Sequence, residues 1–343
     1  MVYFTHFYKM VLLFLFITYA NGTVAKEHHA EMVVIAQSRY FGLCDGSAAM
    51  RIDANTLIVA NDETNVLYSY DISGGYPVSS VDLNKMLPLK TDREIDIEAM
   101  ASFGDRLYWI GSHGQNKNGK DRPNRHMLFA TNIPHRNLDN LEITDGPYDL
   151  TGALKNAPIL HKYFSKKIWK RAPKKGGINI EGIVFDAKGD LLVGLRSPLS
   201  QKKGLLGNAL VVTLAPLGND WSVMGVTEID LGNRGIRDIA AHEEGYLVIA
   251  GDVDAKRTSS LYMWNGSGLL EEIAVKGVSD LNPEAITRID NHWLVLSDDG
   301  RVLRKLLNLD QDAQKTCKKI SEDNAYHPEV FFRGLLLSQK QNQ

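Results

Sequence analysis

The chain has 343 residues, of which 44% are hydrophobic and 23% are charged, as in an ordinary water-soluble globular protein. This length suits one large all-β domain or two domains of average size. The formal net charge is −2, and a nucleic-acid-binding protein would need a basic face. The composition therefore predicts no nucleic-acid partner.

The first 22 residues differ from the rest of the chain. Lys9 is the only formal charge before an apolar run over residues 11–20, whereas about 20 apolar residues are needed to span a bilayer. A basic start, a short apolar run and small residues near Ala20 are typical of a cleavable secretory signal. We expect residues 1–22 to be removed and residues 23–343 to form one exported domain, periplasmic or extracellular, without a membrane span. An uncleaved N-terminal anchor is the alternative.

A pattern of two apolar strands joined by a turn recurs five times along the chain. Each copy opens and closes on a polar residue, and these two residues lie 14 or 15 positions apart. The opening residues are Ser47, Glu98, Glu181, Asp238 and Glu284, and the closing residues are Asp62, His113, Arg196, Asp252 and Asp298. Strand-length apolar runs separated by Gly, Asn or Asp indicate β-hairpins.

Weaker strand patterns follow the hairpins, so that each unit has four antiparallel strands, as does a blade of a β-propeller. Five blades are visible, and the apolar runs at 32–36 and 330–333 either complete the last blade or belong to a sixth. We predict an all-β fold, a β-propeller, with a short helical insertion near 150–171 that ends in a basic run. An irregular β-sandwich is the alternative.

In a propeller the first strand begins, and the second ends, on the same face. The opening residues should therefore form an inner ring at one mouth of the channel, and the closing residues a ring outside it. Carboxylates crowded in a narrow channel repel one another and need protons, cationic neighbours or a metal. Oxygen ligands favour Ca²⁺, so the inner ring of Ser47, Glu98, Glu181, Asp238 and Glu284 is predicted to bind calcium. Alternatively, these acids accept hydrogen bonds from backbone amides or hold water.

The outer ring is predicted to carry the chemistry. His113 can exchange a proton near neutral pH, and the guanidinium of Arg196 matches a carboxylate or a phosphate. Further acid–base candidates are the outer aspartates, Asp62, Asp252 and Asp298. The loop at 114–125 is basic, which suits an anion held between a metal and cationic groups.

Several segments share one pattern: Asp96–Met100, Asn179–Ile183, Gly235–Ile239 and Asn282–Ile286. Over roughly residues 43–305 this pattern resembles a family of exported bacterial β-propeller proteins of unknown function. The blade-start residues Ser47, Glu98, Glu181 and Glu284 are more remotely similar to the calcium-activated nucleotidases (soluble apyrases), five-bladed propellers whose central calcium is held by serine and glutamate. Asp238 departs from that pattern. Propeller phytases and lactonases also have acidic, calcium-bearing channels. These resemblances imply an architecture and a cation, and architecture alone does not specify a substrate.

Two functions follow from these observations. The first is a secreted hydrolase that uses a divalent metal, Ca²⁺, as a Lewis acid on a small anionic substrate, a phosphate ester or an anhydride, or else a hydrolase of the lactonase type. The second is a non-catalytic propeller that binds a glycan, a peptide or a protein, with a structural calcium. The loops at 114–125 and 197–208 contain no aromatic residue, which favours the first. We expect a monomer.

The two cysteines, Cys44 and Cys317, lie near opposite ends of the predicted ring. Because a closed ring brings its ends together, a disulfide between them is geometrically feasible in an oxidising compartment. Two separate buried thiols are the alternative, since sequence does not give their separation.

Overall fold

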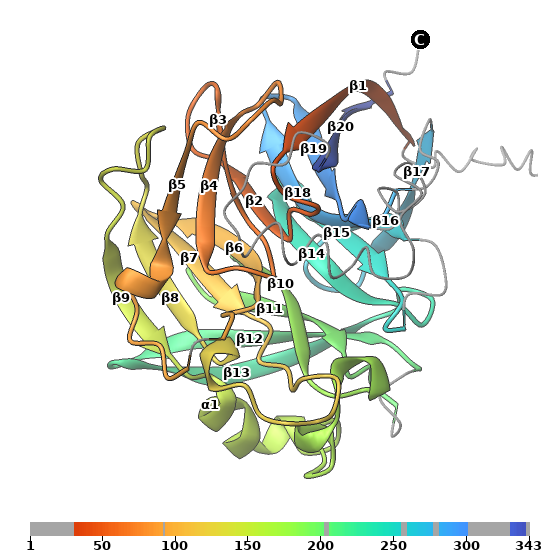
Figure 1. Cartoon of the computed structure of the whole chain (residues 1–343). Coiled ribbons are helices and arrows are strands. Elements are labelled where there is room, and N and C mark those ends of the chain that lie inside the picture. The colour runs from red at the N-terminus through yellow and green to blue at the C-terminus, as the bar shows by residue number, and fades with distance from the viewer. Residues whose placement is uncertain are drawn as a thin grey trace, which may run out of the picture.

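A computed structural model of the chain describes residues 31–91, 93–201, 206–254, 259–276, 281–300 and 330–340. Over these ranges the protein is a β-propeller with five four-stranded blades around a central axis (Figure 1). The predicted signal peptide at residues 1–22 lies outside the described residues.

The first three blades are separate antiparallel sheets in which consecutive strands pair. Blade 1 contains β2 (Ala48–Arg51), β3 (Thr56–Ala60), β4 (Val66–Asp71) and β5 (Ser79–Asp82). Blade 2 contains β6 (Ile97–Phe103), β7 (Arg106–Gly111), β8 (Leu128–Asn132) and β9 (Ile143–Tyr148). Blade 3 contains β10 (Asn179–Phe185), β11 (Leu191–Ser197), β12 (Ala209–Leu217) and β13 (Asp220–Ile229).

The last two blades share an edge. Blade 4 contains β14 (Gly235–His242), β15 (Gly245–Gly251), β16 (Ser260–Trp264) and β17 (Leu270–Lys276). Blade 5 contains β18 (Pro283–Ile289), β19 (His292–Ser297), β20 (Phe331–Gln339) and β1 (Glu31–Phe41). β1 runs antiparallel to β20, and its first residues also pair in parallel with β17.

The innermost strands close a ring of five. β2 contacts β6, and the contacts continue through β10, β14 and β18 back to β2. The predicted propeller is therefore confirmed. The runs at 32–36 and 330–333 complete the last blade by joining β1 to β20, and the described residues form no sixth blade.

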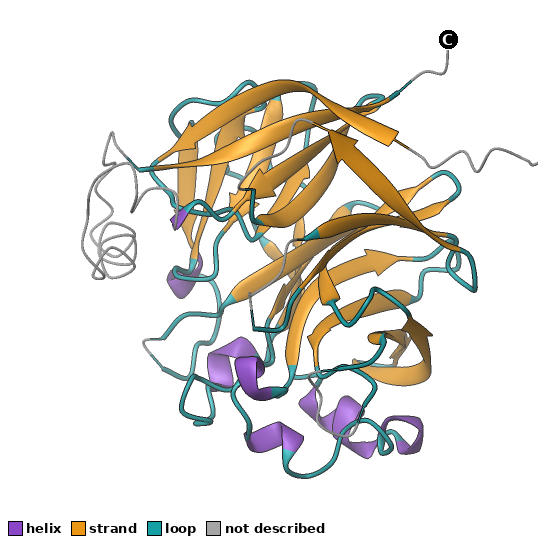
Figure 2. Cartoon of the chain, turned by 90° about the vertical axis from the view of Figure 1, so that its right-hand side faces the viewer, coloured by secondary structure: helices purple, strands orange, loops and turns teal. Residues whose placement is uncertain are grey.

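The predicted helical insertion is also present, as short elements beside β13 (Figure 2). These are α1 (Thr151–Asn156) and the 3₁₀ turns η3 (Pro158–Leu160), η4 (Ile168–Lys170) and η5 (Pro173–Lys175). Leu154, Leu160 and Phe164 pack into the core between blades 2 and 3, while Lys166 and Lys170 stay exposed. The remaining turns are η1 (Leu83–Lys85) and η2 (Pro123–Arg125). Within the described ranges, no helix is long and apolar enough to cross a membrane.

Cys44 is disulfide-bonded. It lies three residues after the end of β1 and packs against Val330 and Phe331, at the start of β20. Cys317, the other cysteine of the predicted pair, lies outside the described residues.

Blade 5 is closed by aromatic packing between its two outer strands. Phe332 of β20 is 0% exposed, and its ring stacks on that of Tyr40 of β1, with centroids 5.0 Å apart. Tyr70 of blade 1 meets Phe332 edge-on at 5.8 Å. This cluster therefore joins the strand that closes the ring to the first blade.

Phe332→Ala should lower the free energy of unfolding by about 3–5 kcal/mol, because it leaves a cavity in this cluster. Met224→Ala is the control, since Met224 is 63% exposed and should change stability by about 0.5 kcal/mol or less. Denaturant unfolding of both variants measures the difference, and equal effects would contradict the proposed closure.

Candidate functional site

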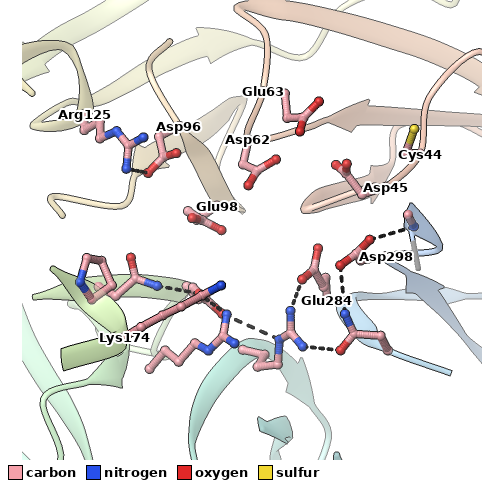
Figure 3. Close-up of a pocket in the computed structure, with 17 residues that line it drawn as sticks. Cys44, Asp45, Asp62, Glu63, Asp96, Glu98, Arg125, Lys174, Glu284 and Asp298 are labelled. Carbon is pink, nitrogen blue, oxygen red and sulfur yellow. Dashed lines mark hydrogen bonds and ion pairs between the residues drawn. The ribbon is translucent and has the colours of Figure 1, made fainter. Parts of the chain in front are cut away.

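A cavity of about 330 Å³ opens at the mouth of the channel where the inner strands begin (Figure 3). Its lining contains eight carboxylates and four cationic side chains. The carboxylates belong to Asp45, Asp62, Glu63, Asp96, Glu98, Glu181, Glu284 and Asp298, and the cations to Arg125, Lys174, Arg196 and Arg237. Full ionisation would leave an excess of negative charge in a partly desolvated space, which is unfavourable without a further cation or proton.

A β-bulge at the start of four inner strands aims one side chain at this cavity. In β6, Ile97 pairs with Gly111 and Ala99 with Ile110, so that Glu98 has no partner across the strand pair. The same register shift leaves three further residues unpaired at the starts of β10, β14 and β18, namely Glu181, Arg237 and Glu284. A bulge of this kind redirects a side chain away from the regular alternation of the strand. All four residues line the cavity.

The fourth bulge corrects the predicted inner ring, because it places Arg237 in the cavity and Asp238 behind the strand. Asp238 is buried and does not line the cavity. Its carboxylate accepts hydrogen bonds from the backbone N–H groups of Ile239 and Ile286, each at 2.7 Å. Asp238 thus joins blade 4 to blade 5 through backbone amides, as the alternative interpretation of the ring proposed.

Burial raises the pKa of Asp238 from 3.8 to about 8, and the two backbone hydrogen bonds offset this only in part. The folded protein then holds a proton that the unfolded chain releases between about pH 4 and pH 8. Stability from this group is therefore fully present below pH 4 and is lost as the pH rises towards 8.

Asp238→Asn removes this titration and keeps an acceptor for one of the two amides, so its overall stability falls at every pH while the pH dependence is lost. We expect the difference in melting temperature, variant minus wild type, to be about 2–4 °C more positive at pH 8.5 than at pH 5. Asp105→Asn, in an exposed turn, is the matched control. Thermal unfolding curves whose pH dependence is parallel for wild type and Asp238→Asn would refute this assignment.

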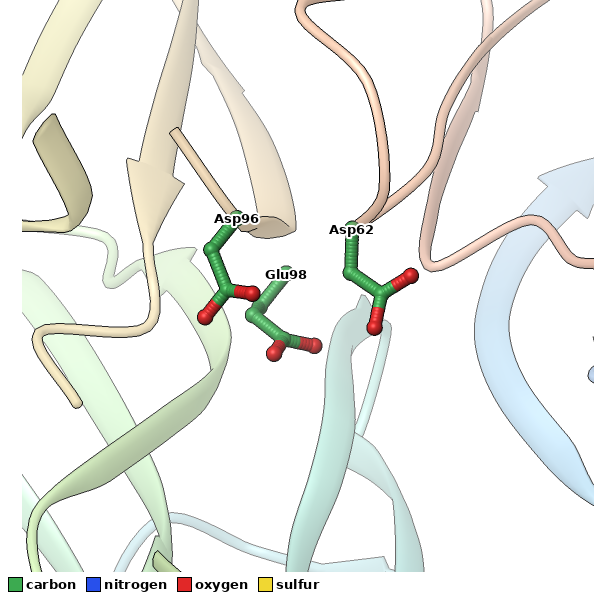
Figure 4. A group of neighbouring side chains, drawn as sticks. All are labelled: Asp62, Asp96 and Glu98. Atoms are coloured by element: carbon green, nitrogen blue, oxygen red, sulfur yellow. The ribbon is translucent and has the colours of Figure 1, made fainter. Parts of the chain in front are cut away.

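Three carboxylates gather tightly on one wall of the cavity. One oxygen atom from each of Asp62, Asp96 and Glu98 lies within 4.8 Å of the others (Figure 4). Burial, followed by the charges of Glu181 and Asp96, raises the pKa of Glu98 well above its usual value. Burial and the charge of Asp96 do the same to Asp62. Mutual repulsion of this kind is what a bound divalent cation relieves.

Two neighbours modify this wall. Asp96 is paired with Arg125, whose Nη1 lies 2.8 Å from its Oδ2, and Arg125 also contacts Glu94 at 2.7 Å. The pKa of the Asp45 carboxyl is raised well above its usual value by burial and then by the charge of Asp62. Figure 3 shows Arg125 on this side of the cavity, beside Asp96, with Lys174 on the other side. We call the group Asp45, Asp62, Asp96 and Glu98 the acidic wall.

The opposite wall carries three of the four cations. Arg237 is 4% exposed and forms ion pairs with Glu284 and, at 3.6 Å, with Glu181. Arg196 binds Glu181 at 2.7 Å and donates a second hydrogen bond to the carbonyl of Asp252. Lys174, from η5, reaches into the cavity from the rim (Figure 3). We call Lys174, Arg196 and Arg237 the cationic wall.

Burial and the nearby charge of Arg196 lower the pKa of Arg237 to about 10, so the guanidinium remains charged at neutral pH. Its position matches that of Glu98 and Glu181 in the other blades. Arg237 therefore supplies a permanent cation inside the predicted ring of acids.

Arg237→Met keeps the length of the side chain but leaves Glu284 and Glu181 without this partner. We expect a loss of about 3 kcal/mol in the free energy of unfolding. Arg288→Met removes an exposed ion pair with Glu243 and should cost about 1 kcal/mol or less. Chemical denaturation of both variants checks this, and comparable losses would show that Arg237 has no special role in the ring.

The outer ring is only partly as predicted. Asp62, Arg196 and Asp298 line the cavity, whereas His113 and Asp252 do not. Strand pairing explains the difference. Arg196 and Asp298 stand two residues after the strand residue that pairs just beyond the bulge, Gly194 and Leu296. The same count from Ile110 in blade 2 and Ile249 in blade 4 reaches Ser112 and Gly251. His113 and Asp252 are therefore one residue beyond the position that faces the cavity, although their spacing from the opening residues fits the pattern.

His113 is buried and has a left-handed backbone conformation. Its Nδ1 lies 2.9 Å from the carbonyl oxygen of Gly111, and its ring stacks against His126 at 5.8 Å. Burial lowers the pKa of His113 to about 4, so the ring is neutral near pH 7. In this position His113 does not face a ligand in the cavity.

Ser47, the first predicted ring member, precedes β2 and is buried without lining the cavity. Its hydroxyl donates a weak hydrogen bond of 3.4 Å to Asp45, which does line the cavity. Ser47 is thus placed to orient the Asp45 carboxylate.

Sequence reasoning missed several lining residues that share one repeat position. Asp45, Asp96, Asn179 and Asn282 each stand two residues before the ring position of their blade, and all four line the cavity. Asn179 and Asn282 donate to Glu181 and to Asp298, respectively. In blade 4 this place is taken by Gly235, where a Cβ atom would collide with the carbonyl oxygen of Arg196. The segments that carried the family resemblance contain this signal, because aligning them places Arg237 opposite the glutamates.

The fold and the cavity together define a five-bladed β-propeller with a strongly charged central pocket. The chain belongs to a family described as protein of unknown function (DUF3616), whose model matches residues 45–133 and 126–290. No curated protein matches the chain.

Solved structures similar to this fold include a glutaminyl cyclase from Myxococcus xanthus, with a TM-score of 0.45 and 10% identity over 91% of this chain and 100% of that chain. A PQQ-bound aldose sugar dehydrogenase from Streptomyces coelicolor has a TM-score of 0.44 and 10% identity over 91% of this chain and 98% of that chain. At this level of similarity neither protein informs the function of the cavity.

Proposed function

We propose that the protein is a divalent-metal-dependent hydrolase that acts on a small anionic substrate, a phosphate ester or anhydride, in the channel cavity. The observation that carries this proposal is the arrangement of opposite charges. Three carboxylates lie within 4.8 Å of one another on the acidic wall, and Lys174, Arg196 and Arg237 stand on the other side. A metal ion bound at the acidic wall would face the side chains of the cationic wall, and an anionic substrate could bind between the two.

The acidic wall suits a hard cation. Asp62, Asp96 and Glu98 provide oxygen ligands only, and backbone carbonyls and waters can complete the six to eight ligands that Ca²⁺ takes. A site without Cys or His among these residues is less suited to zinc. The bound metal would supply Lewis acidity towards a phosphoryl oxygen.

The cationic wall would bind and orient the substrate. Arg196 and Arg237 already hold Glu181 and Glu284, so they provide charge and rigidity more than free hydrogen-bond donors. The side chain of Lys174 is exposed at the rim and makes no ion pair within the described residues. Lys174 is therefore the candidate for direct contact with the anion.

Water would attack the phosphorus atom, the bond to the leaving oxygen would break, and that oxygen would take up a proton. His113 is not placed to donate this proton, because it lies outside the cavity lining and its Nδ1 faces a backbone carbonyl. The proton transfer then falls to a carboxyl group of the cavity or to water.

Calcium binding can be tested separately from catalysis. Ca²⁺ at about 100 times its Kd should stabilise the wild type by about 2.7 kcal/mol relative to protein treated with a chelator. Glu98→Gln should abolish this response without lowering the melting temperature of the metal-free protein, since it removes one of several repelling acids. Glu142→Gln, on the exposed β8–β9 loop, should respond as wild type does. Calorimetric titration that detects no Ca²⁺ binding, or full binding by Glu98→Gln, would exclude the site.

Hydrolysis is tested with a panel of phosphomonoesters, nucleotides, pyrophosphate and lactones, with and without Ca²⁺. We expect Ca²⁺-dependent turnover of a phosphate compound that falls by about 100-fold in Glu98→Gln. Lys174→Ala should raise KM about tenfold with a smaller effect on kcat, whereas Lys188→Ala, in a distant turn, should change neither. Turnover of no compound in the panel by the Ca²⁺-loaded protein would contradict the proposal.

A non-catalytic binding protein is the second candidate. It is favoured by the position of His113, which leaves the cavity without an imidazole. On this account the calcium is structural, and Glu98→Gln loses the stabilisation by Ca²⁺ while no substrate is found.

Export from the cytoplasm is part of the same proposal. It is supported by the basic and apolar pattern of residues 1–22 and by the disulfide at Cys44, since such bonds persist in oxidising compartments. Mass spectrometry of protein recovered from its native host should show a chain that begins near residue 23.

A further inference from the structure

A second cavity, of about 1060 Å³, lies between the loop that follows β7 and the helical insertion. The loop contributes Gln115, Asp121 and His126, and the insertion contributes Lys155, Phe164 and Trp169, among others. No residue of this lining takes part in the channel cavity. We call it the insertion cavity. Its volume is larger than that of the channel cavity and offers room for an extended ligand.

The insertion supplies three lysines to this cavity, Lys155, Lys166 and Lys170. All three side chains are exposed, and none forms an ion pair with a carboxylate within the described ranges. Lys162 of the same insertion, which does not line the cavity, is paired with Glu228 at 3.7 Å. The cations that surround the cavity thus remain available to an anion from outside.

The two carboxylates of the lining do not neutralise these lysines. Asp121 lies 3.4 Å from Nε2 of His126 and accepts a hydrogen bond from Gln115 at 3.0 Å. Asp149 lies 3.7 Å from Nδ1 of the same imidazole and accepts from the backbone N–H of Thr151. Burial opposes ionisation of Asp149, but the nearby imidazole of His126 and the hydrogen bond from Thr151 outweigh it and lower the pKa of Asp149. These acids therefore form a fixed polar side of the cavity that can accept hydrogen bonds from hydroxyl groups.

Aromatic side chains provide the apolar part of the lining of the insertion cavity. Phe164 and Trp169 meet edge to face with their centroids 5.8 Å apart. Nζ of Lys155 lies 4.9 Å from the centre of the Trp169 ring, so a cation and an aromatic surface are presented together. The loops at 114–125 and 197–208 have no aromatic residue, but the insertion brings Trp169 beside the first of them.

We propose that the insertion cavity binds an acidic oligosaccharide, one whose sugar rings carry carboxylate groups. A sugar ring has an apolar face that packs on an aromatic ring, and its hydroxyl groups donate hydrogen bonds to carboxylates. In an acidic oligosaccharide, the carboxylate groups on the rings can also pair with the lysines. All three kinds of partner are present in the cavity: Trp169, the Asp121 and Asp149 pair, and the unpaired lysines. A nucleotide carries its charges on adjacent phosphates and has few hydroxyl groups to donate to the two carboxylates, so it matches this lining less well.

The test is isothermal titration of the full-length protein with hexagalacturonate in the presence of EDTA, which removes Ca²⁺ from both protein and glycan. A neutral hexasaccharide and AMP serve as competing ligand classes. Hexagalacturonate should bind at least about tenfold more tightly than either, and its affinity should fall as salt is added.

Matched variants locate the site. Lys170→Glu should weaken binding about tenfold or more, while Lys188→Glu, the same charge change in the exposed turn between β10 and β11, should change it less than about twofold. Trp169→Ala should weaken binding of the acidic glycan comparably, with circular dichroism as a check of folding. Glu98→Gln should bind as wild type does, which separates this site from the channel cavity.

Absence of binding by the wild type, equal binding of the neutral sugar, tighter binding of AMP, or equal effects of Lys170→Glu and Lys188→Glu would each overturn the proposal.

Discussion

The packing of acidic groups into a small, poorly hydrated channel mouth is the constraint on which the site depends. Isolated carboxylates in such a place would take up protons, and the protein limits this by interleaving cations. Arg237 holds Glu181 and Glu284, Arg196 holds Glu181, and Arg125 holds Asp96. The ion pairs are unevenly distributed over the two walls. Among the described residues, Asp62 and Glu98 form no ion pair with a cation, whereas the cationic wall contains three cations.

This asymmetry arises within a nearly regular repeat. Blades 2 to 5 each offer the same bulged position to the channel, and the residue type there sets the local charge. Acids at all four bulged positions would favour a cation on the axis. Replacement of one acid by Arg237 puts a permanent charge near the axis and moves the favourable cation position to blades 1 and 2, where Asp62, Asp96 and Glu98 lie.

The sequence predicted the propeller, the helical insertion and six of the seventeen residues that line the cavity, which are Asp62, Glu98, Glu181, Arg196, Glu284 and Asp298. Apolar runs and turns recur at every blade, so the hairpins could be recognised from their periodicity. Counting between polar residues failed at Asp238, His113 and Asp252, because a bulge adds a residue and shifts the register without changing the pattern of apolar residues. It also failed at Ser47, because β2 has no bulge that would aim this residue at the cavity. Lys174 and Arg125 come from connections outside the repeat, and no periodic pattern could have placed them.

The joining of β1 to β20 has a kinetic consequence. Met32 pairs with Gln339, so the last blade forms only when segments from opposite ends of the described chain meet. Contacts over such sequence separations are slow to form, because the entropy of the intervening chain is lost before they stabilise the fold. The same join must be broken before the ring can open from this blade, and the aromatic contacts of Phe332 with Tyr40 and Tyr70 resist that step. The ring should thus assemble slowly and, once closed, persist for long periods under conditions that would eventually unfold it.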